Sequence, residues 1–208
     1  NVGVMKGSPD GRFLCQTHFP FTDANSGAPN FAQLFDFDNA SGVISNVRRI
    51  NFPATHYNHC EFSPDSKQLY LTRKNNKQVD QLDISLPTLT DILNSRQSFP
   101  TANAFYDIQL AMDERIYLTQ GSLMLGRINF PNERGTDCDF QQNAINLSPG
   151  TVSVGLPSHI NDIVGASNQG NGFSYTVLDS CRGRVQFNAS TTLAGSITWL
   201  WEFGDNTT

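Results

Sequence analysis

The chain has 208 residues and a formal net charge of −5, so it offers no basic surface for nucleic acid and is long enough for one large domain or two modest ones. Only 16% of its residues are charged, with 4 Lys and 4 Glu, whereas 20 Asn, 18 Ser and 16 Thr supply turn formers and 15 Phe and 5 Tyr supply strand formers. This composition predicts an all-β protein and excludes a helical bundle or a coiled coil.

No apolar run approaches the roughly 20 residues that span a bilayer, so we expect no membrane insertion. The first residues show neither an initiator Met nor a signal-peptide pattern, which predicts a processed or trimmed start. Two adjacent arginines, Arg48 and Arg49, form an isolated basic pair that we expect to be solvated.

The four cysteines, Cys15, Cys60, Cys138 and Cys181, contain no Cys-x-x-Cys pair, so a zinc site or a thioredoxin-type site has no support. One or two disulfides in a secreted or surface-exposed protein would fit, and so would four buried free thiols. We expect Cys15 and Cys60 to lie close together, because one follows and the other precedes neighbouring hairpins.

A short turn motif recurs and organises the first three quarters of the chain. It reads GSPDGRFL at 7–14 and FSPDSKQLYL at 62–71, and a weaker copy reads LAMDERIYL at 110–118. Proline presets the backbone of the turn, and Asp and Gly close it, so each copy predicts a β-hairpin. Ser63, Pro64 and Asp65 form the structural signature of the motif.

Apolar and aromatic runs flank each turn in the same order, so that each unit predicts four short strands. The runs before the turns are 2–5, 57–62 and 104–110, and the later runs are 31–38 and 43–47, then 79–84 and 89–93, then 123–128 and 144–147. Four strands in about 40–50 residues are typical of a β-propeller blade, with the strand before the turn innermost. The alternative is a meandering sandwich with accidental internal similarity.

The order of these segments resembles one group of proteins. The runs CEFSPDSKQLYLT, VDQLDIS, DIQLAMDERIYLT, LGRINFPNERGTDCDF and VGLPSHI resemble propeller regions of large secreted Bacteroidota proteins, over residues 1 to about 164. Such proteins are often labelled gliding-motility-associated and are typically exported by the type IX pathway. The resemblance implies a partial β-propeller of about three blades over residues 1–164, since a closed propeller needs about 4–8.

A second module is expected to follow a polar, glycine-rich linker at 165–172. Within residues 173–208, Tyr175 with Val177 and Val185 with Phe187 alternate with other residues, which predicts two strands with these four side chains inward.

The end of the chain, WLWEFGDN, closely resembles the PKD domain, an Ig-like β-sandwich with a hallmark Trp-Asp-Phe-Gly-Asp-Gly run. The matching residues are Trp201, Phe203, Gly204 and Asp205, whereas Glu202 and Asn206 depart from the run. The resemblance implies a truncated PKD sandwich with Trp201 in its core, and therefore a chain that is a fragment of a larger protein. It also implies that Cys181 has no partner inside the chain, with a bridge to Cys138 as the alternative.

The histidines show no metal-binding pattern. His56 and His59 lie three residues apart at a predicted inner strand, where such positions face opposite sides, so we expect them to be satisfied or exposed. His18 and His159 have no visible partner in the sequence.

Two pairs of carboxylates are candidates for acid–base chemistry or calcium binding. Asp36 and Asp38 share one face of a predicted strand, as Asp137 and Asp139 would if that stretch is extended. The first pair resembles a blade-closing pattern and is assigned a structural role, and neither stretch has EF-hand spacing. Since no catalytic or cofactor motif is visible, we expect no catalytic residue and no cofactor, with calcium unsupported by a motif.

The sequence therefore predicts a non-catalytic scaffold, secreted or at the cell surface and associated with the outer membrane, for adhesion, gliding or surface assembly. Its expected partners are other domains of the same chain and a polysaccharide or surface protein, without nucleic acid. One alternative is an accessory region of a secreted polysaccharide- or peptide-degrading enzyme. The other is a propeller hydrolase whose site lies in missing blades, which carboxylates and His converging on the central channel would favour.

Overall fold

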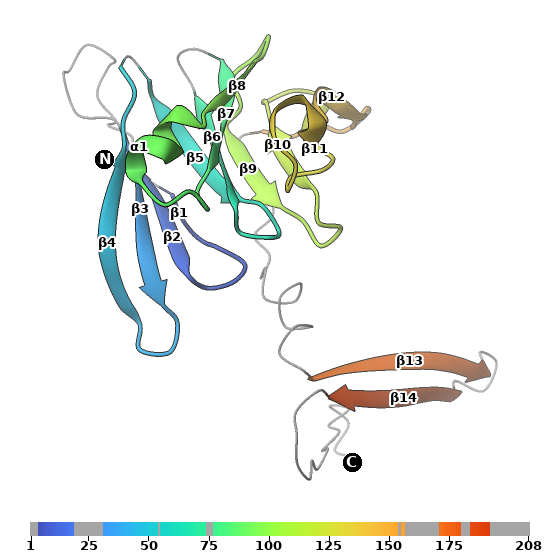
Figure 1. Ribbon diagram of the computed structural model, residues 1–208. Coiled ribbons are helices and arrows are strands. Elements are labelled where there is room, and N and C mark those ends of the chain that lie inside the picture. The colour runs from blue at the N-terminus through green and yellow to red at the C-terminus, as the bar shows by residue number, and fades with distance from the viewer. Residues whose placement is uncertain are drawn as a thin grey trace. The chain divides into compact units, whose positions relative to one another are not determined.

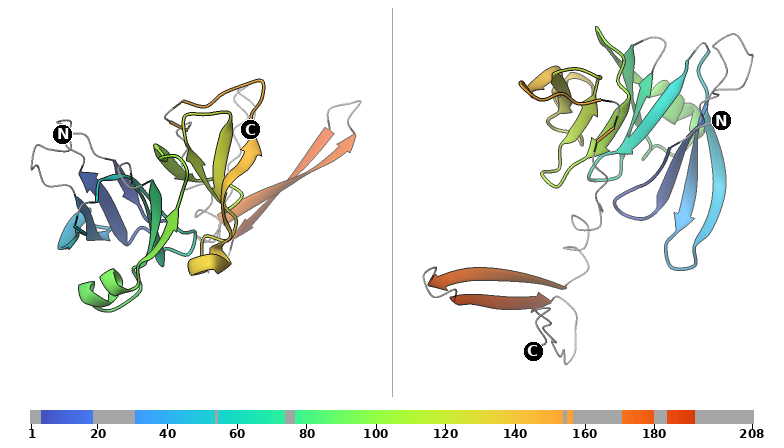
Figure 2. Two further views of the ribbon diagram at one scale, coloured as in Figure 1. Left: turned by 90° about the horizontal axis from the view of Figure 1, so that it is seen from above. Right: turned by 180° about the vertical axis from the view of Figure 1, so that it is seen from behind.

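The structure, a computed structural model, describes residues 4–18, 31–53, 55–73, 77–153, 155–156, 171–179 and 184–191. The chain divides into two compact units, Asn1–Asn161 and Asp162–Thr208, which we treat separately. The first unit is built from three four-stranded antiparallel sheets (Figures 1 and 2). Over the described ranges, no helix is both long enough and apolar enough to cross a membrane.

Each of the three sheets is a meander in which every strand pairs with its neighbour in sequence. Sheet 1 contains β1 (Met5–Gly7), β2 (Phe13–His18), β3 (Phe31–Asp38) and β4 (Val43–Ile50). Sheet 2 contains β5 (Tyr57–Phe62), β6 (Gln68–Arg73), β7 (Gln78–Asp83) and β8 (Gln97–Pro100). Sheet 3 contains β9 (Asp107–Leu110), β10 (Ile116–Thr119), β11 (Met124–Ile128) and β12 (Phe140–Asn146). The first strands lie together, since β5 contacts both β1 and β9. This arrangement is that of consecutive propeller-like blades and confirms the three predicted sheets.

The repeated turn is held together by hydrogen bonds of its serine. The Ser63 N–H donates to the Gln68 carbonyl at 2.9 Å, and the Ser63 hydroxyl donates to Asp65 at 2.7 Å while it accepts from the Gln68 N–H at 2.9 Å. In sheet 1, Ser8 makes the corresponding contacts with Asp10 and Phe13. The residue that closes each turn has a positive φ, which is 70° at Gly11, 61° at Ser66 and 62° at Glu114.

Two apolar clusters hold the sheets together. Alternate residues of β2 and β3 in sheet 1, such as Cys15 and Leu34, pack with Leu69 and Leu82 of sheet 2. Residues on the other side of sheet 2, such as Tyr70, pack with the interior of sheet 3. We call the face that a sheet turns toward the preceding sheet its leading face, and the opposite face its trailing face.

Sheet 2 also contains a buried ion pair between neighbouring strands. Arg73 donates to both carboxylate oxygens of Asp80, at 2.6 and 2.5 Å, and the two side chains are 5% and 0% exposed. The hydroxyls of Ser98 and Tyr57 also donate to Asp80, at 2.7 and 3.2 Å. Burial, followed by the Asp80 charge, raises the pKa of Tyr57, so it stays a donor.

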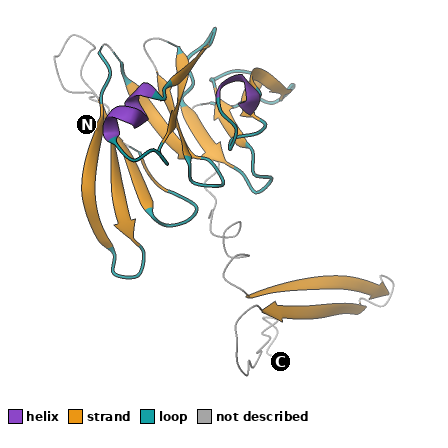
Figure 3. Cartoon of the chain, viewed as in Figure 1, coloured by secondary structure: helices purple, strands orange, loops and turns teal. Residues whose placement is uncertain are grey.

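One predicted strand is wrong, because residues 89–93 lie in a helix. α1 (Leu89–Asn94) is one of the two purple segments in Figure 3. Its N-cap is Thr88, whose hydroxyl accepts from the Asp91 N–H at 3.1 Å and donates to the Asp91 carboxylate at 2.6 Å. This N-cap outweighs the apolar pattern, and the fourth strand is β8 instead. Two predicted inner strands are also shifted: β1 starts at Met5, and β9 starts at Asp107 rather than at residue 104.

The three described cysteines, Cys15, Cys60 and Cys138, are buried free thiols rather than disulfide partners. The prediction that Cys15 and Cys60 lie close together is confirmed, since the Cys60 thiol donates to the Cys15 carbonyl at 3.5 Å. The hydrogen bond with the Cys15 thiol, followed by burial, raises the pKa of Cys60, which makes it a poor nucleophile. Cys181 lies outside the described residues.

The second unit shows one hairpin, β13 (Asn171–Asp179) with β14 (Arg184–Thr191). Tyr175 pairs with Phe187 and Val177 with Val185, so the two predicted strands exist and pair with each other. Residues 171 and 172, which the sequence analysis assigned to the linker, pair with β14. The PKD signature, Trp201, Phe203, Gly204 and Asp205, lies outside the described residues, and the domain limits 1–164, 165–172 and 173–208 stay predictions.

Replacement of Gly126 by Ala should destabilise sheet 3. An added Cβ would lie 2.8 and 2.9 Å from two ring atoms of Phe105, which is 1% exposed and cannot move aside. We expect a loss of about 1–3 kcal/mol in the free energy of unfolding, measured by chemical denaturation. Gly7→Ala is the control, because its nearest neighbour, Leu14, would be at 3.7 Å. Equal stability of the two variants would contradict this packing.

Arg73→Met should be strongly destabilising, because it leaves the Asp80 carboxylate buried without its cation. We expect a loss of about 3–5 kcal/mol in the same denaturation experiment. Arg115→Met is the matched control: its ion pair with Asp113 spans 3.4 Å and both side chains are more than two-fifths exposed. That variant should change stability by less than about 1 kcal/mol. A similar small effect at Arg73 would show that its ion pair is not buried.

Candidate functional site

The first strands of the three sheets are joined by one buried carboxylate. Glu61 on β5 is 0% exposed, and its Oε2 accepts from Lys6 Nζ on β1 at 3.0 Å and from the Leu110 N–H on β9 at 3.1 Å. Its other oxygen accepts from the Phe62 N–H at 3.0 Å. The side chain therefore holds β1, β5 and β9 against one another.

Two residues before Glu61 on β5, His59 lies against a second carboxylate, that of Asp107 on β9. His59 Nδ1 lies 2.8 Å from Asp107 Oδ1, and the two side chains are 26% and 15% exposed. Asp107 also accepts from its neighbour's N–H, that of Ile108, at 2.8 Å, and from the Leu156 N–H at 2.8 Å. The pair is thus partly open to solvent on the histidine side and fixed by backbone groups on the carboxylate side.

The electrostatics of the pair define the state of the imidazole. Burial alone would raise the pKa of Asp107, but the hydrogen bonds from His59, Leu156 and Ile108 and the charge of His59 hold that pKa below its usual value. An ionised Asp107 can only accept, so His59 Nδ1 carries the hydrogen of this bond. In the neutral imidazole, Nε2 is then the basic nitrogen. Among the described residues, Nε2 has no hydrogen-bond partner.

The repeat places both members of the pair. His59 lies four residues before Ser63, and Asp107 lies four residues before Ala111. Ser63 and Ala111 are the residues at which the two turns begin. The N–H of His59 donates to Thr72 Oγ1 at 3.2 Å, and the N–H of Asp107 donates to Thr119 Oγ1 at 3.1 Å. Sequence reasoning missed the pair because it weighed His59 against His56 rather than against the same position in the next unit. Alignment of the turns carries the signal that finds it.

The other predicted histidines are less informative. His59 is paired with Asp107 through Nδ1 only and is 26% exposed. His18 stacks on Phe31 with 5.0 Å between ring centroids. His56 is half-buried, and His159 lies outside the described residues.

The first predicted carboxylate pair has a structural role. Asp38 accepts from the Ala40 N–H at 3.0 Å and from the Ser41 hydroxyl at 2.6 Å, and these bonds, that of Ser41 first, lower its pKa and close the turn between β3 and β4. Asp36 binds the Arg48 guanidinium. The expectation of a solvated arginine pair is therefore wrong for Arg48, whose side chain is 17% exposed. Arg49 stacks over the Phe31 ring at 3.7 Å.

The second predicted carboxylate pair does not share a strand face. Asp137 lies in the 3₁₀ turn η1 (Gly135–Cys138), and Asp139 caps that turn in the left-handed region with φ of 48°. Asp139 instead accepts from Asn129 Nδ2 at 2.7 Å. Over the described ranges, no three His, Cys, Asp or Glu side chains are grouped closely enough to hold a metal ion.

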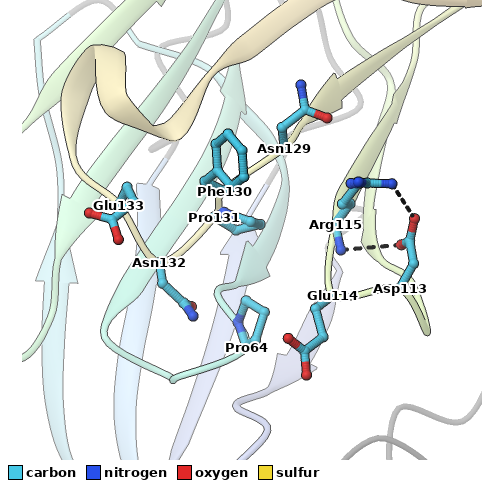
Figure 4. A pocket seen from close by; sticks show the side chains of 9 residues that line it. All are labelled: Pro64, Asp113, Glu114, Arg115, Asn129, Phe130, Pro131, Asn132 and Glu133. Atoms are coloured by element: carbon cyan, nitrogen blue, oxygen red, sulfur yellow. Dashed lines mark hydrogen bonds and ion pairs between the residues drawn. The ribbon is translucent and has the colours of Figure 1, made fainter.

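A separate cavity of about 240 Å³ lies at the turn end of sheets 2 and 3 (Figure 4). Its lining combines the exposed ring of Phe130 with the paired side chains of Asp113 and Arg115. Pro64 of the structural signature also lines it, and the next residue's N–H, that of Asp65, donates to Asn132 at 3.1 Å. Ser63, Pro64 and Asp65 thus form a turn that contacts the neighbouring sheet.

No protein-family model matches the chain, and no curated protein matches it. Among solved structures, it is similar to the periplasmic gluconolactonase of Pseudomonas aeruginosa, with 16% identity and a TM-score of 0.48 over 89% of this chain and 49% of that one. It is also similar to a luciferin-regenerating enzyme, with 14% identity and a TM-score of 0.44 over 73% and 45%. The chain spans about half the length of these proteins. Similarity at this level carries no argument about activity.

The prediction that the chain is not an enzyme is contradicted and needs correction. The solved structures reported above have the names of enzymes, so they lend no support to a non-catalytic chain, and that expectation is withdrawn. The expectation rested on the lack of a visible motif, whereas the contact between His59 and Asp107 joins residues of two different sheets.

The ionised form of Asp107 should stabilise the fold in a pH-dependent way. Because its pKa is lower in the folded protein than its ordinary value of 3.8, the stabilisation is complete above that pH and is lost as the pH falls through the folded value. We expect wild-type protein to be more stable than Asp107→Asn above pH 3.8, with the difference shrinking in more acid solution. Urea denaturation over a pH series measures it, and a difference that stays constant throughout would contradict the bond set.

Proposed function

We propose that the chain carries the hydrolytic site of a propeller-like enzyme, in which His59 acts as a general base toward water. One observation carries the proposal: the 2.8 Å contact between His59 Nδ1 and Asp107 Oδ1 on neighbouring inner strands. Asp107 sets the tautomer and orientation of the imidazole, and the His59 side chain is 26% exposed to solvent. Asp107 is a positioning residue in this scheme.

The reaction is the hydrolysis of a cyclic or linear ester. Water attacks the carbonyl carbon while its proton moves to His59 Nε2, and a tetrahedral intermediate forms. The carbon–oxygen bond to the alcohol then breaks, and the proton passes from Nε2 to the departing oxygen. A lactone therefore gives one hydroxy acid, and the imidazole returns to its starting state. The names of the similar structures make lactones the first substrates to assay.

The predictions about location and partners stay predictions. They comprise the resemblance to secreted gliding-motility-associated propellers, export by the type IX pathway, the PKD-type second module, and contact with a polysaccharide or a surface protein. Over the described residues, no helix is long and apolar enough to cross a membrane. Since the chain spans about half of the proteins it is similar to, the activity of the whole protein is part of the proposal.

Titration of the acid released from a panel of aldonolactones and aryl esters tests the function. We expect His59→Gln to lower kcat by about 10²–10⁴-fold, because the general base is lost. Asp107→Asn should cause a smaller loss, since the imidazole remains but its tautomer is no longer fixed.

Matched controls separate this chemistry from general damage. His56→Gln changes a histidine three residues away, and Asp113→Asn changes a carboxylate in an exposed turn. Both should retain the wild-type rate. The proposal fails if wild-type protein hydrolyses none of the panel above the uncatalysed rate, or if His59→Gln is as active as wild type.

A further inference from the structure

The cavity of Figure 4 lies between two sheets that hold its wall in place. Segment 129–133, which follows β11 of sheet 3, forms much of that wall. The Pro131 carbonyl accepts from the Tyr70 hydroxyl at 2.8 Å, and the Glu133 carbonyl accepts from Gln81 Nε2 at 2.6 Å. Both donors are buried side chains of sheet 2. The cavity is therefore preformed, which lowers the cost of binding a ligand there.

Two amide side chains in the wall are each oriented at one end and available at the other. Asn132 Oδ1 accepts from the Asp65 N–H at 3.1 Å, and among the described residues its Nδ2 has no hydrogen-bond partner. Asn129 Nδ2 donates to Asp139 Oδ2 at 2.7 Å, and its Oδ1 accepts from no group in the described part of the chain. The wall thus offers one fixed donor group and one fixed acceptor.

An aromatic ring and a net negative charge complete the lining. The side chain of Phe130 is 57% exposed, although it belongs to a segment that is fixed to sheet 2. Three carboxylates, of Asp113, Glu114 and Glu133, line the cavity with the single guanidinium of Arg115. An anionic ligand would meet this excess of negative charge and is disfavoured.

We propose that this cavity binds a neutral pyranose sugar. Each sugar hydroxyl both donates and accepts, which matches the available ends of Asn132 and Asn129. The C–H groups on one side of a pyranose ring can pack on the negative face of the Phe130 ring. The volume of about 240 Å³ is below the range of about 300–1,000 Å³ for drug-sized ligands and suits a single sugar ring. This binding is separate from the proposed hydrolysis at His59.

Saturation-transfer NMR on the full chain tests the proposal. The probes are the methyl pyranosides of glucose, galactose and mannose, together with N-acetylglucosamine. At least one of them should bind, with a dissociation constant in the millimolar range because the ligand is small. Phe130→Ala should weaken that binding by about tenfold or more, since the sugar loses its packing surface.

A second variant tests the polar contact without disturbing the turn. Asn132→Asp keeps an oxygen that can accept from the Asp65 N–H but removes the Nδ2 donors, so it should also weaken sugar binding by about tenfold. Met112→Ala is the matched control, because Met112 is 66% exposed beside Asp113 and lies outside the lining of this cavity. It should bind the sugar like wild type, and circular dichroism should show that all three variants fold.

The result is independent of the proposed enzyme activity. The four probes contain no ester, and His59→Gln should bind them as wild-type protein does, whether or not the wild type hydrolyses lactones.

Three results would overturn the proposal. The first is a wild-type chain that binds none of the four probes at high millimolar concentration. The second is binding that Phe130→Ala leaves unchanged. The third is a preference for charge, shown by tighter binding of glucuronate, which would make Arg115 the anchor, or by binding of glucosamine without any of the neutral sugars, which would mean that only the carboxylates act.

Discussion

The buried carboxylate of Glu61 is the interaction on which the arrangement of the three sheets depends. Its two oxygens accept from groups of three different strands, Lys6 on β1, Phe62 on its own strand and Leu110 on β9. A carboxylate without these donors would be too costly to bury, so the donors and the strands that carry them must stay in place. The apolar faces of the three sheets then pack with β1, β5 and β9 already held in position by Glu61.

The alignment of β5 with β9 also creates the candidate functional site. With β5 and β9 held side by side, positions four residues before each turn come together, and these are His59 and Asp107. The same threonine position supports each of them through its hydroxyl. Neither residue is distinctive within its own unit. The site exists because two units with different residues at one equivalent position are neighbours.

Much of the fold could be predicted because the turns are encoded locally. Ser63 and Asp65 satisfy the backbone of their own hairpin, so the motif specifies the strands on either side. The helix α1 was missed because a hydroxyl and a carboxylate at its start decide its conformation, whereas the apolar pattern reads equally well as a strand. The candidate site was missed for another reason. Its two residues are 48 positions apart, and only the spatial adjacency of whole units brings them into contact.

The meander order of the strands has a consequence for how the protein forms during synthesis. In every sheet, each strand pairs only with strands next to it in sequence, so a sheet can complete its hydrogen bonds once its own segment has left the ribosome. Contacts between sheets can form in the same order, because the leading face of each sheet packs on the sheet that was synthesised before it. Synthesis from the N-terminus therefore matches the order in which the three sheets can fold, and none of these sheets needs a strand from a distant part of the chain.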